Sequence, residues 1–250
     1  MEIITVNQDN LWDEHICCAL ANKKDKQVVS KKQWLENQFK LGLVFKKMNV
    51  RGKCFIEYGP LDTSAINLEG DNLCFINCFW VSGKYQGQGN AKILLEECKK
   101  DCLEKGYDGL VIIAAKKKQP FVMDYDFLVH HGFVSVACID DYEIMFLKLN
   151  DQTALPVIKF KQMSSRDDGF VLYYSNQCPF TAKYVPLLET YCQENNIKFQ
   201  AILLNDYKEA KKVNTLFSTY SLFYNHHFIT REILTVKKFI KIMEELNAKD

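Results

Sequence analysis

The sequence predicts an α+β/α/β protein in two parts: a mixed β-sheet flanked by helices, followed by a small α/β domain. Three observations support this prediction. Short apolar stretches typical of strands alternate with helix-forming segments along the chain. The order of these segments changes at residues 151–168, a polar stretch with a proline and a Ser/Asp-rich end. The length of 250 residues accommodates two domains of ordinary size.

The composition is typical of a soluble globular protein. Hydrophobic residues make up 48% and charged residues 25% of the chain, and the formal net charge is +1. This balance gives no broad attraction to nucleic acid or to an anionic membrane, so neither partner is expected. No apolar run approaches the roughly 20 residues that span a bilayer, and residues 1–10 lack the apolar core of a signal peptide. We therefore expect a cytoplasmic protein, and the oligomeric state stays open.

The ten cysteines are dispersed, many of them within apolar runs, which is typical of buried, reduced thiols. Cys74 and Cys78 are about 13 Å apart on one expected strand, too far to share a zinc ion. Cys98 and Cys102 share a helix face, but no second pair with ligand spacing follows. No metal site is expected.

The first part, residues 1–150, is predicted to have the order β-α-α-β-β-β-α-β-α-β-β. Residues 2–6 form the first strand, and two helices follow over 11–22 and 31–41. The second helix is expected to begin with a capping box of Ser30 and Gln33. Segments 53–59 and 63–69 look like a hairpin, and the strongly apolar segment 72–81 is expected at the centre of its sheet.

The rest of this part is predicted from breaks in the apolar pattern. A helix with one apolar face ends at Gly106, and a buried strand follows over 109–115. A short helix over about 124–131 stops at Gly132. Two final strands flank Asp140-Asp141.

Residues 151–168 are interpreted as a linker with room for one short strand. The second part, 169–250, is predicted to have the order β-α-β-α-β-β-α, with a turn near Asn225-His226 between its last two strands.

Two glycines lie where the central strand of the first part gives way to a helix, in FWVSGKYQGQGNAKILLEE, residues 79–97. A P-loop motif is absent. A dinucleotide-binding fingerprint would begin at Gly87 and Gly89, but Lys92 stands at its third glycine position. The stretch does match the pattern [Arg/Gln]-x-x-Gly-x-[Gly/Ala], through Gln86, Gly87, Gln88, Gly89, Asn90 and Ala91.

In this pattern the sequence resembles the GNAT superfamily of acetyl-CoA-dependent N-acetyltransferases. The element order of residues 1–150 and the segment HHGF, 130–133, agree with that resemblance. It implies that backbone amides from Gln86 to Ala91 hold the pyrophosphate of acetyl-CoA. It also implies that the strand end Phe79, Trp80 and Val81 binds the pantetheine arm, with an N–H near Phe79 polarising the thioester carbonyl.

Elementary chemistry agrees with this assignment. The first N–H groups of a helix are unpaired and carry a partial positive charge, which suits a diphosphate. Glycines at positions 87 and 89 remove the side chains that would block its approach.

The catalytic residues are less well defined. Many relatives have a tyrosine that protonates the departing thiolate at the position of Leu128. On a helix, Tyr125 and His131 lie three residues to either side and are candidate general acids. Glu57 on a neighbouring strand is a candidate general base, although an amine with a modest pKa needs only a water relay.

The second part resembles thioredoxin-like proteins, with Cys178-Pro179-Phe180-Thr181 at the place of their active-site turn. A cysteine at a helix N-terminus is expected to have a lowered pKa, but Thr181 supplies no resolving thiol. A GNAT part followed by a degenerate thioredoxin-like part is the layout of the YoaP-type acetyltransferases. We expect this second part to shape the substrate site or to bind a partner.

Together these features predict an acetyl-CoA-dependent N-acetyltransferase that acts by direct attack within a ternary complex. The acceptor is a small-molecule or peptide amine whose identity the sequence leaves open. Two alternatives stay open as well. One is a monothiol thioredoxin-like redox protein that uses Cys178, and the other is a non-catalytic acyl-CoA-binding or adaptor module.

Overall fold

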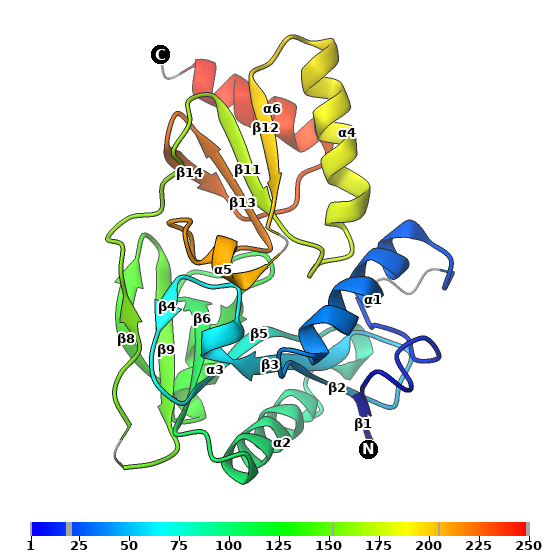
Figure 1. The fold of residues 1–250 in the computed structure, drawn as a ribbon, viewed down its shortest axis with the longest axis vertical. Coiled ribbons are helices and arrows are strands. Elements are labelled where there is room, and N and C mark those ends of the chain that lie inside the picture. The colour runs from blue at the N-terminus through cyan, green and yellow to red at the C-terminus, as the bar shows by residue number, and fades with distance from the viewer. Residues whose placement is uncertain (1, 19–21, 152, 205, 249–250) are drawn as a thin grey trace.

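The computed structural model describes residues 2–18, 22–151, 153–204 and 206–248 (Figure 1). An eight-stranded sheet contains the described strands of the first part except β4 (Leu68–Glu69), in the order β1-β2-β3-β5-β6-β9-β8, with β7 beside β6. Its strands are β1 (Ile3–Val6), β2 (Val44–Met48), β3 (Cys54–Pro60), β5 (Leu73–Val81), β6 (Gly109–Ala115), β7 (Met123–Asp124), β8 (Val134–Ile139) and β9 (Tyr142–Lys148).

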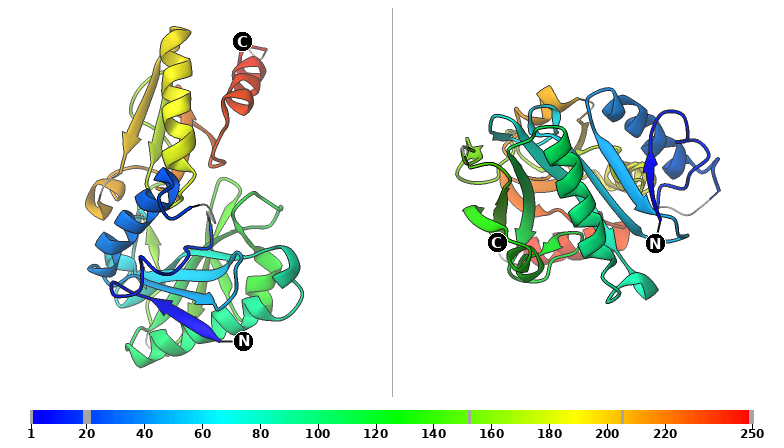
Figure 2. Two further views of the ribbon diagram at one scale, coloured as in Figure 1. Left: turned by 90° about the vertical axis from the view of Figure 1, so that its right-hand side faces the viewer. Right: turned by 90° about the horizontal axis from the view of Figure 1, so that it is seen from below.

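Helices cover both faces of this sheet (Figures 1 and 2). On one face, α2 (Asn90–Glu104) and α3 (Tyr125–His130) bury their apolar sides against the central strands. On the other face lie α1 (Lys26–Phe39) and the second part of the chain. Two short 3-10 helices, η1 (Leu61–Thr63) and η2 (Gly83–Tyr85), connect strands to the elements that follow them.

The second part has a four-stranded sheet in the order β12-β11-β13-β14. The first two strands in this order are parallel, and β13 and β14 run antiparallel to their neighbours. Its elements are β11 (Phe170–Tyr174), α4 (Thr181–Glu194), β12 (Phe199–Leu203), α5 (Tyr207–Ala210), β13 (Tyr220–Tyr224), β14 (His227–Thr230) and α6 (Val236–Asn247). This is the element order that the sequence predicts; the likeness to thioredoxin stays a prediction.

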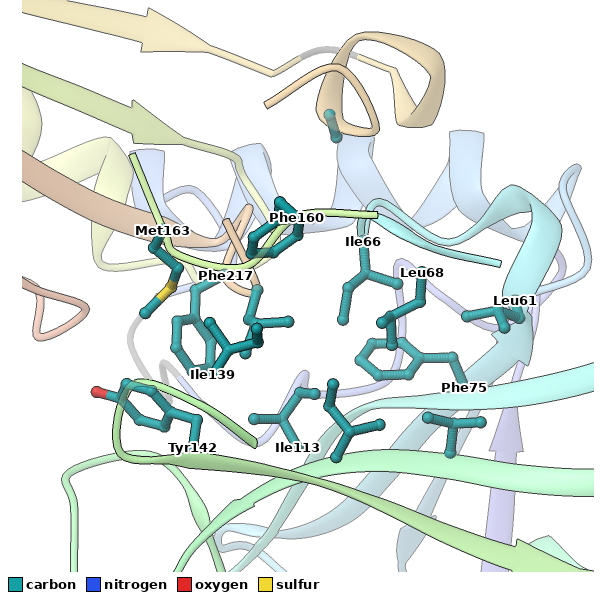
Figure 3. Packing of buried hydrophobic residues seen from close by; sticks show 14 of the residues in the cluster. Leu61, Ile66, Leu68, Phe75, Ile113, Ile139, Tyr142, Phe160, Met163 and Phe217 are labelled. Carbon is teal, nitrogen blue, oxygen red and sulfur yellow. The ribbon is translucent and has the colours of Figure 1, made fainter. Parts of the chain in front are cut away.

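One hydrophobic cluster joins the two parts of the chain (Figure 3). Phe75 and Ile113 extend from the large sheet, Phe160 and Met163 come from the connecting segment, and Phe217 comes from the second part. Because these side chains are buried against one another, the second part is packed onto the sheet and is not merely tethered to it.

The helix expected over 11–22 is not formed in the part of it that the structure describes. Residues 11–18 form turns, with Leu11 and Ile16 buried against the α1 face of the sheet; residues 19–21 lie outside the described chain. The following helix begins at Lys26, where the Asp25 side chain accepts a hydrogen bond from the Gln27 N–H. The predicted capping box at Ser30 is therefore wrong, because an aspartate five residues earlier caps the helix.

The predicted hairpin of segments 53–59 and 63–69 is also wrong. The neighbours of β3 are β2 and β5, and β4 (Leu68–Glu69) pairs with β10 (Val157–Ile158) in the connecting segment. The sequence did not indicate β2 because Lys46 and Lys47 interrupt its apolar pattern. Both lysines are buried, Lys46 against Glu97 at 2.8 Å and Lys47 against Glu14 at 2.8 Å.

Substitution of Tyr142 tests whether the shared cluster holds the two parts together. Its ring, 6% exposed on β9, lies 4.5 Å from that of Phe217 and 6.2 Å from that of Phe228, both in the second part. We expect Tyr142→Ala to lower the free energy of unfolding by about 3 kcal/mol, because the lost ring leaves a cavity. Chemical denaturation measures this difference.

Leu155→Ala is the control for this change, because Leu155 is 55% exposed in the connecting segment. It should alter stability by less than about 0.5 kcal/mol. Equal stability of the two variants would contradict a shared core.

Candidate active site

The two central strands of the large sheet separate soon after they meet. Strand β5 pairs with β6 over Leu73–Phe75 and Gly109–Val111, and the pairing stops there although both strands continue. A gap therefore opens between the carboxyl ends of β5 and β6, where strand ends in an α/β sheet commonly bind ligands.

An extra residue in β5 adds to this separation. The register against β3 passes from Ile76 to Cys78, so that Asn77 is a β-bulge. The bulge shifts the alternation of side chains by one position. Phe75 consequently belongs to the cluster on the second-part face, whereas Phe79 belongs to the cluster on the α2 face.

Main-chain groups at the end of β5 face the gap. The Ser82 N–H donates to the Lys53 carbonyl at 2.9 Å, so Ser82 and, by alternation, Trp80 are the residues that bond to β3. The N–H and C=O groups of Phe79 and Val81 then point away from β3, toward the side where β6 has separated. The Val81 carbonyl accepts a hydrogen bond from Gln86 Nε2 at 3.0 Å, which leaves the Phe79 groups and the Val81 N–H for a ligand.

The glycine turn ends at the N-terminus of α2. Gly87 and Gly89 have φ values of +71° and +75°, and a Cβ atom at either position would meet nothing within 4 Å. Within the described chain, none of the six backbone N–H groups from Gly87 to Lys92 has a hydrogen-bond partner, and the first helical bond joins Ile93 to Gly89. This row of free donors beside open space is suited to an anion such as a diphosphate.

Three side-chain amides hold this turn in shape. Gln86 bonds to Val81 as described, Gln88 Nε2 donates to the Lys84 carbonyl at 2.6 Å, and Asn90 Nδ2 donates to the Tyr85 carbonyl at 2.9 Å. The Gln86 main chain differs from the expectation, because its N–H already donates to the Gly83 carbonyl at 3.1 Å. The free amides thus run from Gly87 to Lys92 and not from Gln86 to Ala91.

These features border one continuous groove, which we call the donor groove. Its walls are the end of β5, the glycine turn and the segment 118–124 opposite them. Phe79, Trp80, Val81, Gln86, Gly87, Gly89, Asn90 and Ala91, all predicted cofactor-binding residues, line it. Of that predicted set, Gln88 alone is not on its walls.

A second hollow, which we call the inter-part cavity, lies between the large sheet and the second part. Its empty volume, including its opening to solvent, is about 1200 Å³. Residues from both parts line it, including Glu57 and Cys78 from the sheet and Gln177, Cys178 and Arg231 from the second part. The donor groove and the inter-part cavity share Phe79, Trp80, Phe121, Val122 and Met123 as walls, so the two spaces adjoin at the end of β5.

Glu57 places a carboxylate on the wall of the inter-part cavity. It is 1% exposed, and its Oε1 lies 2.7 Å from Lys31 Nζ on α1. Its Oε2 is buried without a hydrogen-bond partner. Burial raises the pKa of Glu57, and the charge and hydrogen bond of Lys31 offset part of that rise. A partly unsatisfied carboxylate with a raised pKa is suited to accept a proton from an amine.

The candidate general acids lie elsewhere. Leu128 is 0% exposed in the core beneath α2, so the position of the expected tyrosine is a packing position. Neither Tyr125 nor His131 is on the walls of the donor groove or the inter-part cavity. The His131 Nδ1–H donates to the Phe127 carbonyl at 2.8 Å, and the centre of its ring lies 4.3 Å from that of the Phe127 ring, with the two planes tilted by 32°.

Cys178 differs from the expectation of a reactive thiol. It lies before α4, but burial raises its pKa, and a backbone hydrogen bond at Phe180 offsets only part of this effect. Burial also raises the pKa of Cys78 on the opposite wall. A raised pKa lowers the thiolate fraction of both residues at neutral pH, which disfavours the monothiol redox alternative.

The sequence did not indicate two residues that reach the cavity from the second part. Gln177 Nε2 donates to the carbonyl of the bulged Asn77 at 3.1 Å, and Arg231 NH1 donates to the Pro120 carbonyl at 3.1 Å. A compositional signal did exist for Arg231. It is one of three arginines among 32 basic residues and stands close to the apolar residues Ile229 and Ile233.

The His, Cys, Asp and Glu side chains of the described chain form no group of three or more that could hold a metal ion. No described helix combines the length and apolar character needed to cross a membrane.

The family models match this chain in both parts. A model described as "Acetyltransferase (GNAT) family" matches residues 9–121, and one described as "YoaP-like" matches residues 198–241. A protein of Bacillus subtilis (strain 168), described as "Uncharacterized N-acetyltransferase YoaP", is 36% identical over 247 residues, covering 97% of this chain and 98% of that protein.

Solved structures with a similar fold include two acetyltransferases in complex with their coenzyme. The PaiA N-acetyltransferase of Thermoplasma acidophilum with coenzyme A is 17% identical to this chain, with a TM-score of 0.41. The match covers 59% of this chain and 99% of the PaiA chain. The putative acetyltransferase YncA of Salmonella typhimurium with acetyl-CoA is 16% identical and covers 62% and 97%, with a TM-score of 0.44.

The family models and the B. subtilis relative support neither the redox alternative nor the adaptor alternative. The likeness to the B. subtilis protein extends over nearly the whole length of both chains. The chain therefore belongs to the GNAT family of acetyl-CoA-dependent N-acetyltransferases, and it carries a YoaP-like second domain.

Proposed function

We propose that the chain acetylates a small-molecule amine held in the inter-part cavity, with acetyl-CoA in the donor groove. The observation that carries this proposal is that the two spaces adjoin at Phe79, whose N–H faces the gap between β5 and β6. A thioester at this point lies within reach of an amine that enters from the cavity.

The donor groove supplies binding and polarisation. The free amides from Gly87 to Lys92 hold the diphosphate of acetyl-CoA. The exposed main chain of Phe79 and Val81 pairs with the pantetheine arm in the manner of an added strand. The Phe79 N–H donates to the thioester carbonyl oxygen, where negative charge develops in the transition state.

Glu57 acts as the general base in this scheme. Its unpartnered Oε2 takes a proton from the ammonium group of the acceptor, directly or through a water. The amine nitrogen then attacks the thioester carbon, the new N–C bond forms, and the C–S bond breaks. Coenzyme A leaves as a thiolate, and the second proton of the attacking nitrogen passes through water to its sulfur, since Tyr125 and His131 lie off the walls of both spaces. Glu57 then returns the first proton to solvent.

The second domain makes the acceptor site in this proposal. Its residues Gln177, Cys178 and Arg231 form the wall opposite the sheet. This wall from the second domain stands over the sheet and limits the room for a chain that extends beyond the amine. It favours a small-molecule amine over a peptide or protein terminus.

Gly89→Ala tests the diphosphate site. We expect it to weaken acetyl-CoA binding by about tenfold or more, or about 1.4 kcal/mol, because the added methyl group occupies the approach to the free amides. Isothermal titration calorimetry measures this affinity.

Gly106→Ala is a matched control at the other end of the same helix. Gly106 has a φ of +76°, close to the +75° of Gly89, and its Cβ would also meet nothing within 4 Å. Both variants should lose about 1 kcal/mol of stability from left-handed backbone strain. Equal acetyl-CoA affinities for the two variants would contradict the assigned site.

Glu57→Gln tests the general base. We expect the rate of coenzyme A release in the presence of the best amine of a panel to fall by about 100-fold or more. Acetyl-CoA affinity should stay unchanged, because Glu57 is not on the walls of the donor groove. The rate is followed by thiol detection with saturating acetyl-CoA.

Two further variants separate chemistry from stability. The Glu57→Gln change leaves Lys31 as an unpaired buried cation, and the double variant Lys31→Met/Glu57→Gln removes that cation. Its stability should therefore recover, while the rate of coenzyme A release stays low. In Glu97→Gln a carboxylate paired with Lys46 at 2.8 Å is lost outside both spaces, and the rate should be retained. Wild-type turnover by Glu57→Gln would refute the role of this residue.

A further inference from the structure

The inter-part cavity contains polar atoms that lack partners. Its walls are mainly apolar, with Phe75, Phe121, Phe217 and several isoleucines. Four of the residues that line it nevertheless carry buried polar atoms without a hydrogen bond, namely Glu57 Oε2, Trp80 Nε1, Tyr220 Oη and Arg231 Nε. Such atoms cost free energy unless a ligand or water satisfies them, so they mark where a polar ligand would bind.

Arg231 is the cation of this set. Its guanidinium lies 4.3 Å from the centre of the Phe217 ring, and it donates one hydrogen bond, from NH1 to the Pro120 carbonyl. Among the described residues, no carboxylate forms an ion pair with it. Burial lowers the pKa of Arg231 to about 10, which still leaves it charged at neutral pH.

A purely structural role explains only part of this arrangement. The bond to Pro120 and the contact with Phe217 use one donor and one face of the guanidinium. An arginine has five N–H donors in a planar fork that matches a carboxylate. The Arg231 side chain is half-buried, and its Nε is buried without a hydrogen-bond partner. This Nε and the other donors that are not bonded to Pro120 are those that a ligand carboxylate would satisfy.

Opposite charges face the same space across the cavity. Both Glu57 and Arg231 act electrostatically on Cys78 and Cys178, which line the cavity between the sheet and the second domain. Glu57 comes from the sheet and Arg231 from the second domain. A ligand with an ammonium group toward Glu57 and an anionic group toward Arg231 is complementary to this pair.

We propose that the acceptor is a small amine that also carries a carboxylate and an apolar body, such as an apolar amino acid, and that Arg231 binds its carboxylate. This inference rests on the proposed function and names its substrate class. In this arrangement the amine lies near Glu57 and the thioester, and the apolar body packs against the aromatic walls. Trp80 Nε1–H supplies a second donor to the ligand.

The test compares amino acids with the same amines lacking the carboxylate. Coenzyme A release is measured with two amino acids, L-leucine and L-phenylalanine, and with the corresponding amines that lack the carboxylate, 3-methylbutylamine and 2-phenylethylamine. O-Phosphoethanolamine is included as an amine that carries a phosphate instead. We expect kcat/KM for the amino acids to exceed that of their decarboxylated counterparts by about 100-fold or more, since a site built to bond a group rejects the analogue that lacks it.

Arg231→Met should reduce this preference to about threefold or less, because it keeps an apolar stem against Phe217 and removes every donor. Arg231→Lys, which keeps the charge but not the fork, should give an intermediate preference. Arg166→Met is the matched control. Arg166 also donates to a main-chain carbonyl, that of Lys212 at 3.4 Å, but it is exposed and lines neither space.

Calorimetry measures the acetyl-CoA affinity of each variant and so shows whether its donor groove is intact. This measurement separates failure of this inference from failure of the proposed function. Equal turnover with and without the carboxylate would overturn the inference while leaving acetyl transfer standing. A preference that Arg231→Met leaves unchanged would overturn it as well. Faster turnover of O-phosphoethanolamine than of the other amines would indicate a phosphate site and would also overturn the inference. The absence of turnover with any of these amines would overturn it too.

Discussion

The early end of pairing between β5 and β6 is the constraint on which the site depends. Three residues of each strand pair, and both strands then continue without each other. Full pairing would bond the main chain of Phe79 to β6 and close the donor groove. The bulge at Asn77 acts in the same direction, because it turns Phe79 toward α2 and Trp80 toward the opposite face. An unsatisfied strand end is thereby available to a ligand that can pair with it.

The second domain is joined to this strand end by both apolar and polar contacts. The shared hydrophobic cluster fixes its position on the sheet (Figure 3). Gln177 then bonds to the bulged residue itself, while its Oε1 accepts a hydrogen bond from Thr219 at 2.8 Å. The second domain therefore contacts the strand end at which donor and acceptor would meet. This contact gives a physical reason for the two domains to occur in one chain.

The sequence predicts the elements whose pattern is local. The strands at 72–81 and 109–115 are apolar throughout, and the glycine turn is marked by residues that readily adopt positive φ. Strand β2 could not be predicted in this way, since Lys46 and Lys47 are neutralised by acids distant in sequence. Residues 11–18 show helical spacing but serve as an apolar cover for the sheet.

The two spaces of the site also differ in how well the sequence predicts them. The donor groove is formed by one continuous segment and its neighbours, so a local motif indicates it. The inter-part cavity exists only after the second domain packs on the sheet, and the sequence positions of Glu57 and Arg231 give no sign that they share it. The domain boundaries near residues 150 and 169 stay predictions.

A crystal structure with acetyl-CoA, or with a non-hydrolysable analogue of it, would show directly whether the end of β5 and the glycine turn bind the coenzyme. We expect the thioester carbonyl oxygen at hydrogen-bond distance from the Phe79 nitrogen, about 3 Å, with the diphosphate on the amides of Gly87–Lys92. A coenzyme whose diphosphate lies away from this turn, or whose thioester lies away from the end of β5, would contradict it.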